Sequence, residues 1–173
     1  MPETSLIIDD FSHAHAQNAI GTNWQLFTDR VMGGLSHGSI VREMVSGRSA
    51  IHMRGDVSLE NNGGFIQISL DLAPDGNSFD ASSWLGIEID VYGKSADYDM
   101  RIRTSELTRP WQSYRQNFTV EPHWETVRLF FGQFEPHRTE KPLNIHRLRR
   151  LGLVAIGRAF LPDLALGRIS FFA

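Results

Sequence analysis

The residues that could do chemistry in this chain are its histidines and carboxylates, and their spacing decides whether they could act together. His13 and His15 are close enough in sequence to share one face of a strand. A metal site needs a third and a fourth ligand, and the sequence marks none. A Ser-His-Asp triad cannot be recognised from spacing. Glycoside hydrolysis needs a pair of acids, and the sequence does not distinguish such a pair among the available Asp29, Glu60, Asp90 and Glu106. We therefore predict no metal, no cofactor and no enzymatic activity.

Two stretches with paired glycines are the next candidates, because glycine-rich loops can bind phosphate. The first reads DRVMGGLSHG at residues 29–38, and the second reads LENNGGF at residues 59–65. Neither has the G-x-G-x-x-G or G-x-x-x-x-G-K-[ST] spacing of a nucleotide-binding loop. The sequence after the first stretch, SIVREMV, is typical of a strand rather than of the helix that such a loop precedes. We therefore do not expect a nucleotide here.

Backbone shape explains the paired glycines better. Glycine allows positive φ angles and the close approach of another segment, and Asp29 and Ser36 can exchange hydrogen bonds with their own loop. The loops are then either pinned turns, with Met32 as an adaptable apolar plug, or the rim of a binding surface. They could lie side by side at one end of the molecule. The second interpretation assigns partner binding to Asp29, Met32, Gly33, Gly34, Ser36, Asn61, Asn62, Gly63 and Gly64.

A second candidate surface combines aromatic rings with arginines. The segment TSELTRPWQSYR, residues 104–115, offers Trp111 and Tyr114 beside several guanidinium groups. Arg101 and Arg103 are predicted on the polar face of the preceding strand. Such a mixture could bind a carbohydrate. The alternative is that the rings cover the core and the arginines stack on them.

Two further groups of charges have more than one interpretation. If consecutive strands pair, Arg101 and Arg103 form a charge ladder with Glu88 and Asp90; otherwise they belong to a polar sheet face that binds an anionic or polar ligand. A second basic group is expected on the solvated face of a short helix, with an acidic partner surface as the alternative. Its members are Arg138, Lys141, Arg147, Arg149 and Arg150.

Alternation with a period of two residues indicates the elements that position these side chains. In FIQISLDL the apolar residues alternate with Gln67, Ser69 and Asp71, which is typical of a half-buried strand. Many short strands separated by turn sequences predict an antiparallel sandwich or barrel. The clearest strands are 65–72, 86–92, 98–103 and 125–130, and weaker ones are 5–11, 23–27, 38–45, 49–54, 112–120, 150–156 and 164–172.

Helix signals are scarce. Residues 78–84 could hold one turn, and residues 142–152 could hold two turns with Asn144 as the N-cap and with Ile145 and Leu148 facing inward. No linker or low-complexity segment divides the chain. We therefore predict a single domain over residues 1–173.

Composition excludes several classes of protein. The chain has 17 basic and 20 acidic residues and a net charge of −3, which gives no general attraction to nucleic acid. It has no cysteine, which excludes a disulfide framework and a thiol nucleophile. No run approaches the ~18 apolar residues that a membrane span needs, and the first residues, MPETSLIIDDF, do not read as a secretion signal. We expect a cytoplasmic protein that is not integral to a membrane.

Taken together, the two glycine stretches resemble the complex I intermediate-associated protein 30 family. That family's pattern is a tryptophan followed by D-x-V-M-G-G-x-S and then by G-x-(V/L)-S-L-x-N-N-G-G-F. Here Trp24 precedes DRVMGGLS, and the second motif reads GDVSLENNGGF from Gly55 to Phe65. The family's later strands are resembled by two further segments, GIEIDVYGKSADYDMRIRTS and YRQNFTVEPHWETVRLFFGQFEP. The likeness therefore extends over nearly the whole chain, and the chain resembles a compact, bacterial-type member of the family.

The resemblance implies a galactose-binding-like jelly-roll β-sandwich, distantly similar to some carbohydrate-binding modules. Eukaryotic members of the family are mitochondrial chaperones that assist the assembly of respiratory complex I. The resemblance implies no catalytic residues. We therefore expect a non-enzymatic domain that binds a protein partner, such as a respiratory-complex subunit or assembly intermediate, with a carbohydrate-binding module as the alternative.

Overall fold

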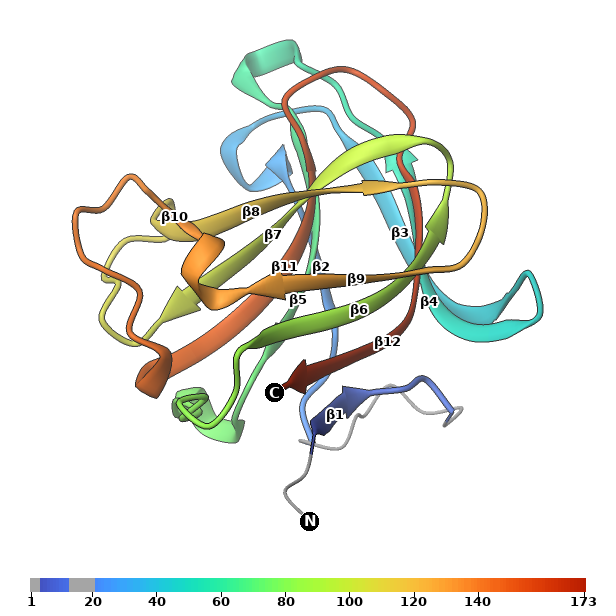
Figure 1. Cartoon of the computed structure of the whole chain (residues 1–173). Helices are drawn as coiled ribbons and strands as arrows, with labels where there is room; N and C mark the ends of the chain where they lie inside the picture. Colours follow the sequence, from blue (N-terminus) through green and yellow to red (C-terminus); the bar gives the residue numbers. More distant parts are fainter. Residues whose placement is uncertain (1–3, 13–20) are drawn as a thin grey trace.

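The computed structural model describes residues 4–12 and 21–173, and in this part of the chain two antiparallel sheets pack face to face (Figure 1). One sheet has the strand order β3-β4-β12-β6-β9, with β1 also paired to β12, and the other has the order β10-β8-β7-β11-β5-β2. We call them the β6 sheet and the β7 sheet. The strands are β1 (Ser5–Asp9), β2 (Gln25–Thr28), β3 (His37–Val45), β4 (Arg48–Asp56), β5 (Phe65–Asp71), β6 (Gly86–Gly93), β7 (Ala96–Thr104), β8 (Ser113–Val120), β9 (Glu125–Phe130), β10 (Glu135–His137), β11 (Leu148–Ile156) and β12 (Asp163–Phe172).

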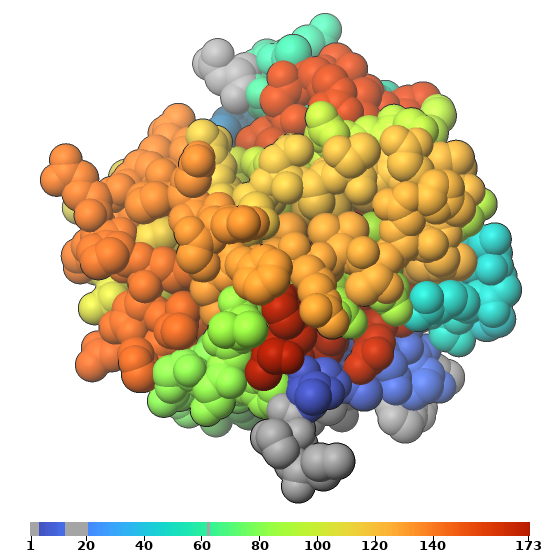
Figure 2. Space-filling view, viewed as in Figure 1, coloured from blue at the N-terminus to red at the C-terminus, as the bar shows by residue number. Residues whose placement is uncertain are grey.

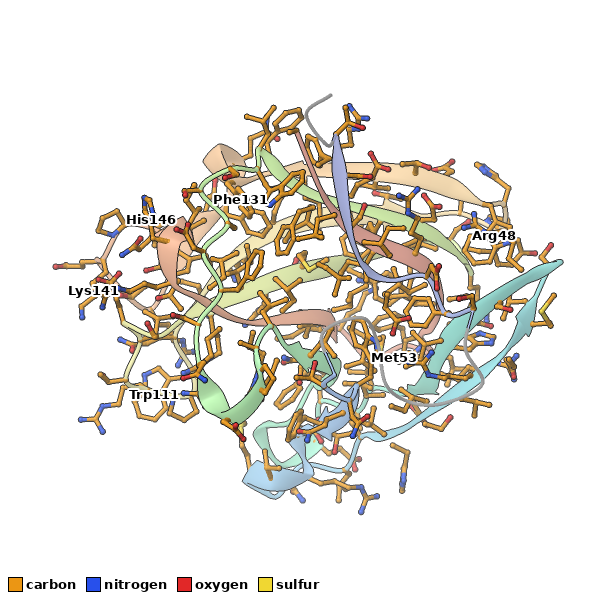
Figure 3. All side chains as sticks on the ribbon, turned by 90° about the horizontal axis from the view of Figure 1, so that it is seen from below. Arg48, Met53, Trp111, Phe131, Lys141 and His146 are labelled. Carbon is orange, nitrogen blue, oxygen red and sulfur yellow. The ribbon has the colours of Figure 1, made fainter. Side chains whose placement is uncertain are left out.

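The core lies between the two sheets and is filled by the apolar members of the alternating strands. Ile66, Ile68 and Leu70 of β5 are fully buried, as are the inward residues of β6 and β7. Met53 of β4 is labelled within this layer in Figure 3. The predicted all-β sandwich of the jelly-roll type is therefore confirmed.

Strand β12 occupies a central position in the β6 sheet. It pairs with β6 along nearly its whole length, and its other edge pairs first with β4, from Asp163 to Leu166, and then with β1, from Ile169 to Phe172. Figure 2 shows the N-terminal segment, in blue, against the red C-terminal strand. Segments from opposite ends of the described chain thus share one sheet.

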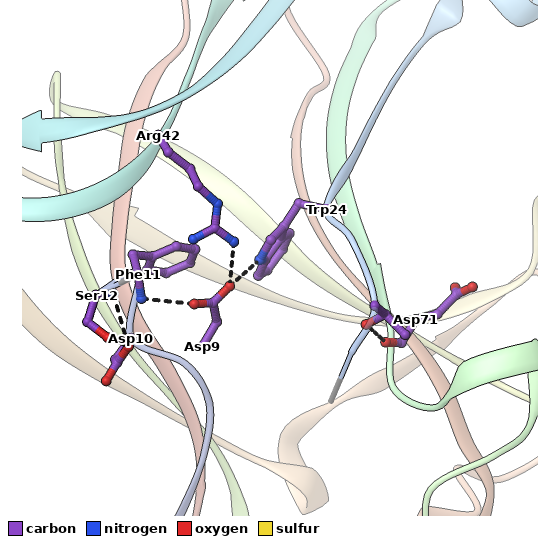
Figure 4. A network of polar contacts seen from close by, with 8 residues as sticks. Asp9, Asp10, Phe11, Ser12, Trp24, Arg42 and Asp71 are labelled. Atoms are coloured by element: carbon purple, nitrogen blue, oxygen red, sulfur yellow. Dashed lines mark hydrogen bonds and ion pairs between the residues drawn. The ribbon is translucent and has the colours of Figure 1, made fainter. Parts of the chain in front are cut away.

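A buried carboxylate fixes the N-terminal strand (Figure 4). Asp9 accepts hydrogen bonds from the backbone N–H of Phe11 at 2.8 Å, from Trp24 Nε1 at 3.0 Å and from Arg42 Nη2 at 2.9 Å. The Arg42 guanidinium also lies over the Phe11 ring, 5.1 Å from its centroid. Because these partners come from separate parts of the chain, Asp9 links β1 to β3 and to the segment before β2.

The helix predictions need correction, because the described residues contain short 3-10 turns rather than α-helix. These are η1 (Asp29–Met32), η2 (Glu60–Asn62), η3 (Pro74–Gly76), η4 (Phe131–Gln133) and η5 (Ile145–Arg147). Asn144 does cap η5 by accepting from the His146 N–H at 3.1 Å, but Leu148 already begins β11. In the segment 78–84, Phe79 instead forms an isolated bridge with Leu148 before a turn.

The predicted charge ladder between β6 and β7 is wrong. Although only two residues separate these strands, β6 belongs to one sheet and β7 to the other. Glu88 therefore lies opposite Arg128 of β9 rather than opposite an arginine of β7. The polar faces of β6 and β7 point away from each other, on opposite outer surfaces of the sandwich.

Candidate functional site

The two glycine loops lie side by side at the upper end of the molecule in Figure 1, joined by one buried carboxylate. Asp29 in η1 is fully buried. It accepts hydrogen bonds from Ser36 N at 3.0 Å, Ser36 Oγ at 2.5 Å, Gly64 N at 2.5 Å and Phe65 N at 3.2 Å. Ser36 Oγ in turn accepts from Ser58 N at 2.9 Å. The predicted juxtaposition of the loops is confirmed, and Asp29 is its cause.

The glycines are required by backbone angle and by space. Gly33 has a φ of 87°, which glycine adopts at low cost. A Cβ atom at Gly34 would overlap the Asp29 carboxylate, and one at Gly63 would lie 2.5 Å from Asp29 Oδ2. The glycines therefore let two backbone segments approach the carboxylate closely enough to donate to it.

The hydrogen bonds also set the charge state of Asp29. Burial acts to raise the pKa of this carboxyl, but the hydrogen bonds from Ser36, Gly64 and Phe65 together outweigh burial and hold the pKa below its ordinary value. Asp29 is thus an anion stabilised by neutral donors. It holds the loops in one shape and does no acid–base work near neutral pH.

This end of the molecule exposes several aliphatic side chains beside polar ones. Val31 is 74% exposed and Met32 is 61% exposed, and Leu35 and Leu59 are also exposed. We call these four residues the loop platform. Asp29 and Ser36, which the sequence assigned to partner contact, are fully buried, so they shape the platform and cannot touch a partner. Met32 is likewise outside rather than a plug, and the Asn62 side chain lies outside the described part of the structure.

A groove of about 410 Å³ runs over the outer face of the β7 sheet next to this platform. Val31 of the platform is also part of the groove lining, so the two surfaces are continuous. Phe27 and Phe65 come from β2 and β5, on one side of β11, and Trp111 comes from the segment before β8, on the other side. The polar lining residues are Gln67, Arg101, Arg103, Thr108, Gln112, Ser113, Arg149 and Arg150.

The arginines of this face lie across from one another. Arg101 is the cross-strand partner of Arg115, and Arg103 is the cross-strand partner of Arg150. Burial lowers the pKa of Arg103, and the positive charges of Arg150 and Arg149 lower it further. Like charges in directly opposite positions destabilise a sheet, so this face carries an electrostatic cost.

Two of the arginines have acidic neighbours, and one is held by backbone. Arg150 Nε donates to Asp71 at 2.7 Å, and Arg101 Nη2 lies 3.4 Å from Asp99. Arg103 Nη1 instead donates to the carbonyl oxygens of Arg109 at 2.9 Å and Gln112 at 3.2 Å. These bonds fix the Arg103 side chain without neutralising its charge.

The predicted ligand residues divide into three that line the groove and one that does not. Arg101, Arg103 and Trp111 all line it, and Trp111 is 55% exposed. Figure 3 shows Trp111 at the edge of the molecule, on the side opposite Arg48. Tyr114 is a correction: it points into the core, is fully buried and donates its hydroxyl to the Lys141 carbonyl at 3.0 Å. The strand alternation places Tyr114 inward together with Ile102, its cross-strand partner.

The expected helical basic cluster is also a correction. Of the helix predicted for this segment, only the 3-10 turn η5 forms, and β11 begins directly after it. Arg149 and Arg150 therefore belong to β11 and line the groove. Sequence reasoning also missed Phe27, Phe65 and Gln67 as lining residues. The outward position of Gln67 was visible in the alternation of β5, but its proximity to arginines of β7 depends on the intervening strand β11.

Among residues 4–12 and 21–173, no group of three or more histidine and acidic side chains could hold a metal ion. His13 and His15 lie outside the described residues. Of the acids considered for paired catalysis, Asp29 is enclosed by its donors and Asp90 pairs with Arg48 at 2.9 Å on the β6 sheet. Over the same residues, no helix is long and apolar enough to cross a bilayer.

The described strands form a two-sheet antiparallel β-sandwich, and the family model for complex I intermediate-associated protein 30 matches residues 10–164. The chain belongs to this family. No curated protein matches the sequence.

Solved structures with a similar fold include carbohydrate-binding modules. The family 11 module of the cellulosomal cellulase Lic26A-Cel5E of Clostridium thermocellum superposes with a TM-score of 0.78 and 14% identity, covering 100% of this chain and 96% of that one. A family 11 module from Clostridium thermocellum in complex with a β-1,3-1,4-mixed-linked tetrasaccharide gives 0.76 and 13%, covering 100% and 98%. The family 30 module of its cellulase Cel9D-Cel44B gives 0.60 and 14%, covering 78% and 82%. At these identities the likeness shows the fold alone.

Proposed function

We propose that this protein is a non-catalytic binding domain that captures a protein partner on the loop platform, as an assembly factor does with an incompletely assembled subunit. The observation that carries the proposal is the Asp29 network. It locks both loops into one rigid shape that exposes the aliphatic side chains of Val31, Met32, Leu35 and Leu59. Grouped aliphatic side chains exposed on a surface are typical of a protein-interaction site.

The rigidity of the platform matters for affinity. A loop that is already ordered loses little conformational entropy when a partner binds. The described loops are ordered by the buried hydrogen bonds to Asp29, and an exposed hydrogen bond from Asn61 Nδ2 to the Gly33 carbonyl at 3.3 Å adds to them. Membership of the family supports a partner from a respiratory or another membrane-associated complex. An assembly factor of this kind would stabilise the unassembled subunit by mass action.

The test is affinity capture from the native host, comparing the wild-type protein with the double variant Val31→Ser/Met32→Ser. A matched control exists on β3 of the other sheet, where Val41 and Met44 are 51% and 66% exposed. We expect subunits of a membrane-associated complex to co-purify with the wild type and with Val41→Ser/Met44→Ser. The platform variant should recover about tenfold less, since two buried aliphatic contacts are lost. Absence of any such subunit, or equal losses in both variants, contradicts the proposal.

A second candidate function is carbohydrate binding in the groove. It is favoured by the exposed Trp111 ring, which lines the groove together with Gln67, Gln112 and Arg101. The most similar folds reported above include a module bound to a tetrasaccharide. Binding to a glycan array that is lost in Trp111→Ala, with the loop platform intact, would replace the protein-partner proposal by this one.

A further inference from the structure

We propose that the arginine groove of the β7 sheet binds an acidic segment of a polypeptide, with the ligand's carboxylates held by Arg101, Arg103 and Arg149. This inference rests on the proposed function, because it makes the groove the second half of the surface that holds the protein partner. It adds a chemical requirement that the loop platform does not have.

The first argument is the charge of the groove against that of the whole chain. The protein carries a net charge of −3, yet four arginines line this groove. Arg103 lies opposite Arg150, and Arg101 lies opposite Arg115, in neighbouring strand pairs. Asp71 and Asp99 neutralise part of this charge through Arg150 and Arg101. The remaining positive charge selects an anionic occupant.

The second argument is that the arginines are held in place for a ligand. Arg103 is fixed by two backbone carbonyls, so its guanidinium loses little freedom on binding. Arg101 lines the same groove, and its buried Nε donates no hydrogen bond within the described part of the chain. A guanidinium group presents donors in a planar fork that matches both oxygens of a carboxylate. A carboxylate is therefore a suitable counter-group for this face.

The third argument favours a polypeptide over an acidic polysaccharide. The groove is continuous with the loop platform through Val31, and its walls also contain Phe27 and Phe65. An acidic polypeptide segment can supply carboxylates for the arginines and aliphatic side chains for the platform. A polysaccharide has no aliphatic side chains to cover Val31 and Met32, which are exposed on the platform.

The inference can be tested with a fluorescein-labelled peptide of alternating glutamate and leucine, measured by fluorescence anisotropy on the whole protein. A peptide of alternating glutamine and leucine has the same shape without the charge. Oligogalacturonate and a mixed-linked glucan tetrasaccharide represent the acidic and neutral sugar alternatives. We expect the glutamate peptide to bind at least about tenfold more tightly than the glutamine peptide, and salt to weaken its binding by screening the charges.

Variants locate the binding on one sheet. Arg149→Gln removes an exposed arginine of the groove, and Arg128→Gln removes an arginine that is 58% exposed on β9 of the other sheet. We expect Arg149→Gln to weaken peptide binding about tenfold, as the loss of a charged hydrogen bond does, and Arg128→Gln to leave it unchanged. Arg103→Gln removes the arginine that the backbone carbonyls hold in place, and it should also weaken peptide binding. Circular dichroism verifies that this variant is folded.

Several results would overturn the inference: equal binding of the two peptides, equal losses in Arg149→Gln and Arg128→Gln, or tighter binding of either saccharide than of the glutamate peptide. The proposed function has a separate outcome. If Arg149→Gln and Arg103→Gln capture the native partner as well as the wild type does, while Val31→Ser/Met32→Ser does not, the groove inference fails and the platform proposal stands. If no partner is captured at all, the platform proposal fails, and the peptide result still decides which ligand chemistry the groove accepts.

Discussion

On the outer face of the β6 sheet, basic side chains lie across from acidic ones, whereas the β7 sheet sets arginines across from arginines. Glu88 is opposite Arg128, with an ion pair of 2.8 Å, and Asp90 is opposite Arg168. The β6 sheet therefore gains from its surface charges, although each exposed pair contributes only about 0.2–1 kcal/mol.

The β7 sheet has pairs of opposite charge too, Arg150 with Asp71 and Arg115 with Glu135, but it also sets like charges across from each other. Arg101 faces Arg115, and Arg103 faces Arg150. An arrangement that costs stability but concentrates one sign of charge in a groove is suited to binding rather than to folding. The comparison teaches that the two outer faces differ in how their charges are arranged, and this difference supports the proposal that the β7 face binds a ligand.

The largest expected effect comes from Asp29, which joins the two glycine loops beside the groove. Asp29→Ala leaves the buried donors of Ser36, Gly64 and Phe65 without an acceptor. We expect the free energy of unfolding to fall by about 3 kcal/mol or more, measured by urea denaturation. Hydrogen exchange should increase in the glycine loops and beside the groove before it increases in the β6 sheet.

The control for this variant is Asp56→Ala, because Asp56 is exposed at the end of β4. It should change the free energy of unfolding by less than about 0.5 kcal/mol. A similar loss in both variants, or increased exchange spread evenly over both sheets, would break the comparison.

The same carboxylate predicts a pH dependence. The pKa of Asp29 in the folded protein lies below its ordinary value of 3.8, so the unfolded chain binds a proton at higher pH than the folded one. The stability that Asp29 contributes is therefore fully present above the unfolded-state pKa and is lost as the pH falls through the folded-state pKa. The difference in unfolding free energy between the wild type and Asp29→Ala should narrow only below about pH 4. If the difference in unfolding free energy already narrows between about pH 7 and pH 5, which is above the ordinary pKa of an aspartate, this assignment is contradicted.

Charge reversal on the two sheets gives a smaller, paired effect. Arg128→Glu removes the ion pair with Glu88 and the contact with the Phe172 ring, and it places two acids opposite each other. We expect a loss of about 1 kcal/mol. Arg149→Glu instead removes one positive charge from beside Arg103, and should leave stability unchanged or raise it by about 0.3 kcal/mol. Thermal or urea unfolding at low salt measures both, and equal losses would show that the sheets do not differ.

The smallest effect is the titration of one histidine at the edge of the β7 sheet. Burial lowers the pKa of His137, and the charges of Arg115, Arg101 and Arg138 lower it further. Arg115→Gln should therefore raise the pKa of His137 in an NMR titration, whereas Arg128→Gln should not change it. An unchanged pKa in Arg115→Gln would show that the positive field of this face is weaker than the structure implies.

What the sequence predicted was mostly local in origin. Asp29 and Ser36 are close to the glycines they serve, so their hydrogen bonding to the loop followed from spacing. The outward direction of Arg101 and Arg103 followed from alternation within one strand. The family motifs extended this to the neighbouring loop, which supplies the Gly64 donor.

What the sequence did not predict depends on pairing between distant strands. Two residues between strands usually indicate a hairpin, but here the chain crosses from β6 in one sheet to β7 in the other. The arginine pairs and the groove depend on which strands β7 then pairs with, namely β8 and β11. The link from Asp9 to Arg42 spans 33 residues and has no local signal at all.

The central position of β12 has a consequence for how the protein is made. During synthesis β4 and β6 emerge long before the strand that separates them, and β1 waits for the same partner. Until residues 163–172 have left the ribosome, one layer of the sandwich remains in pieces with open hydrogen-bonding edges. The protein that we propose as an assembly factor thus passes through an incompletely paired stage during its own synthesis, in which these open edges must not pair with other chains.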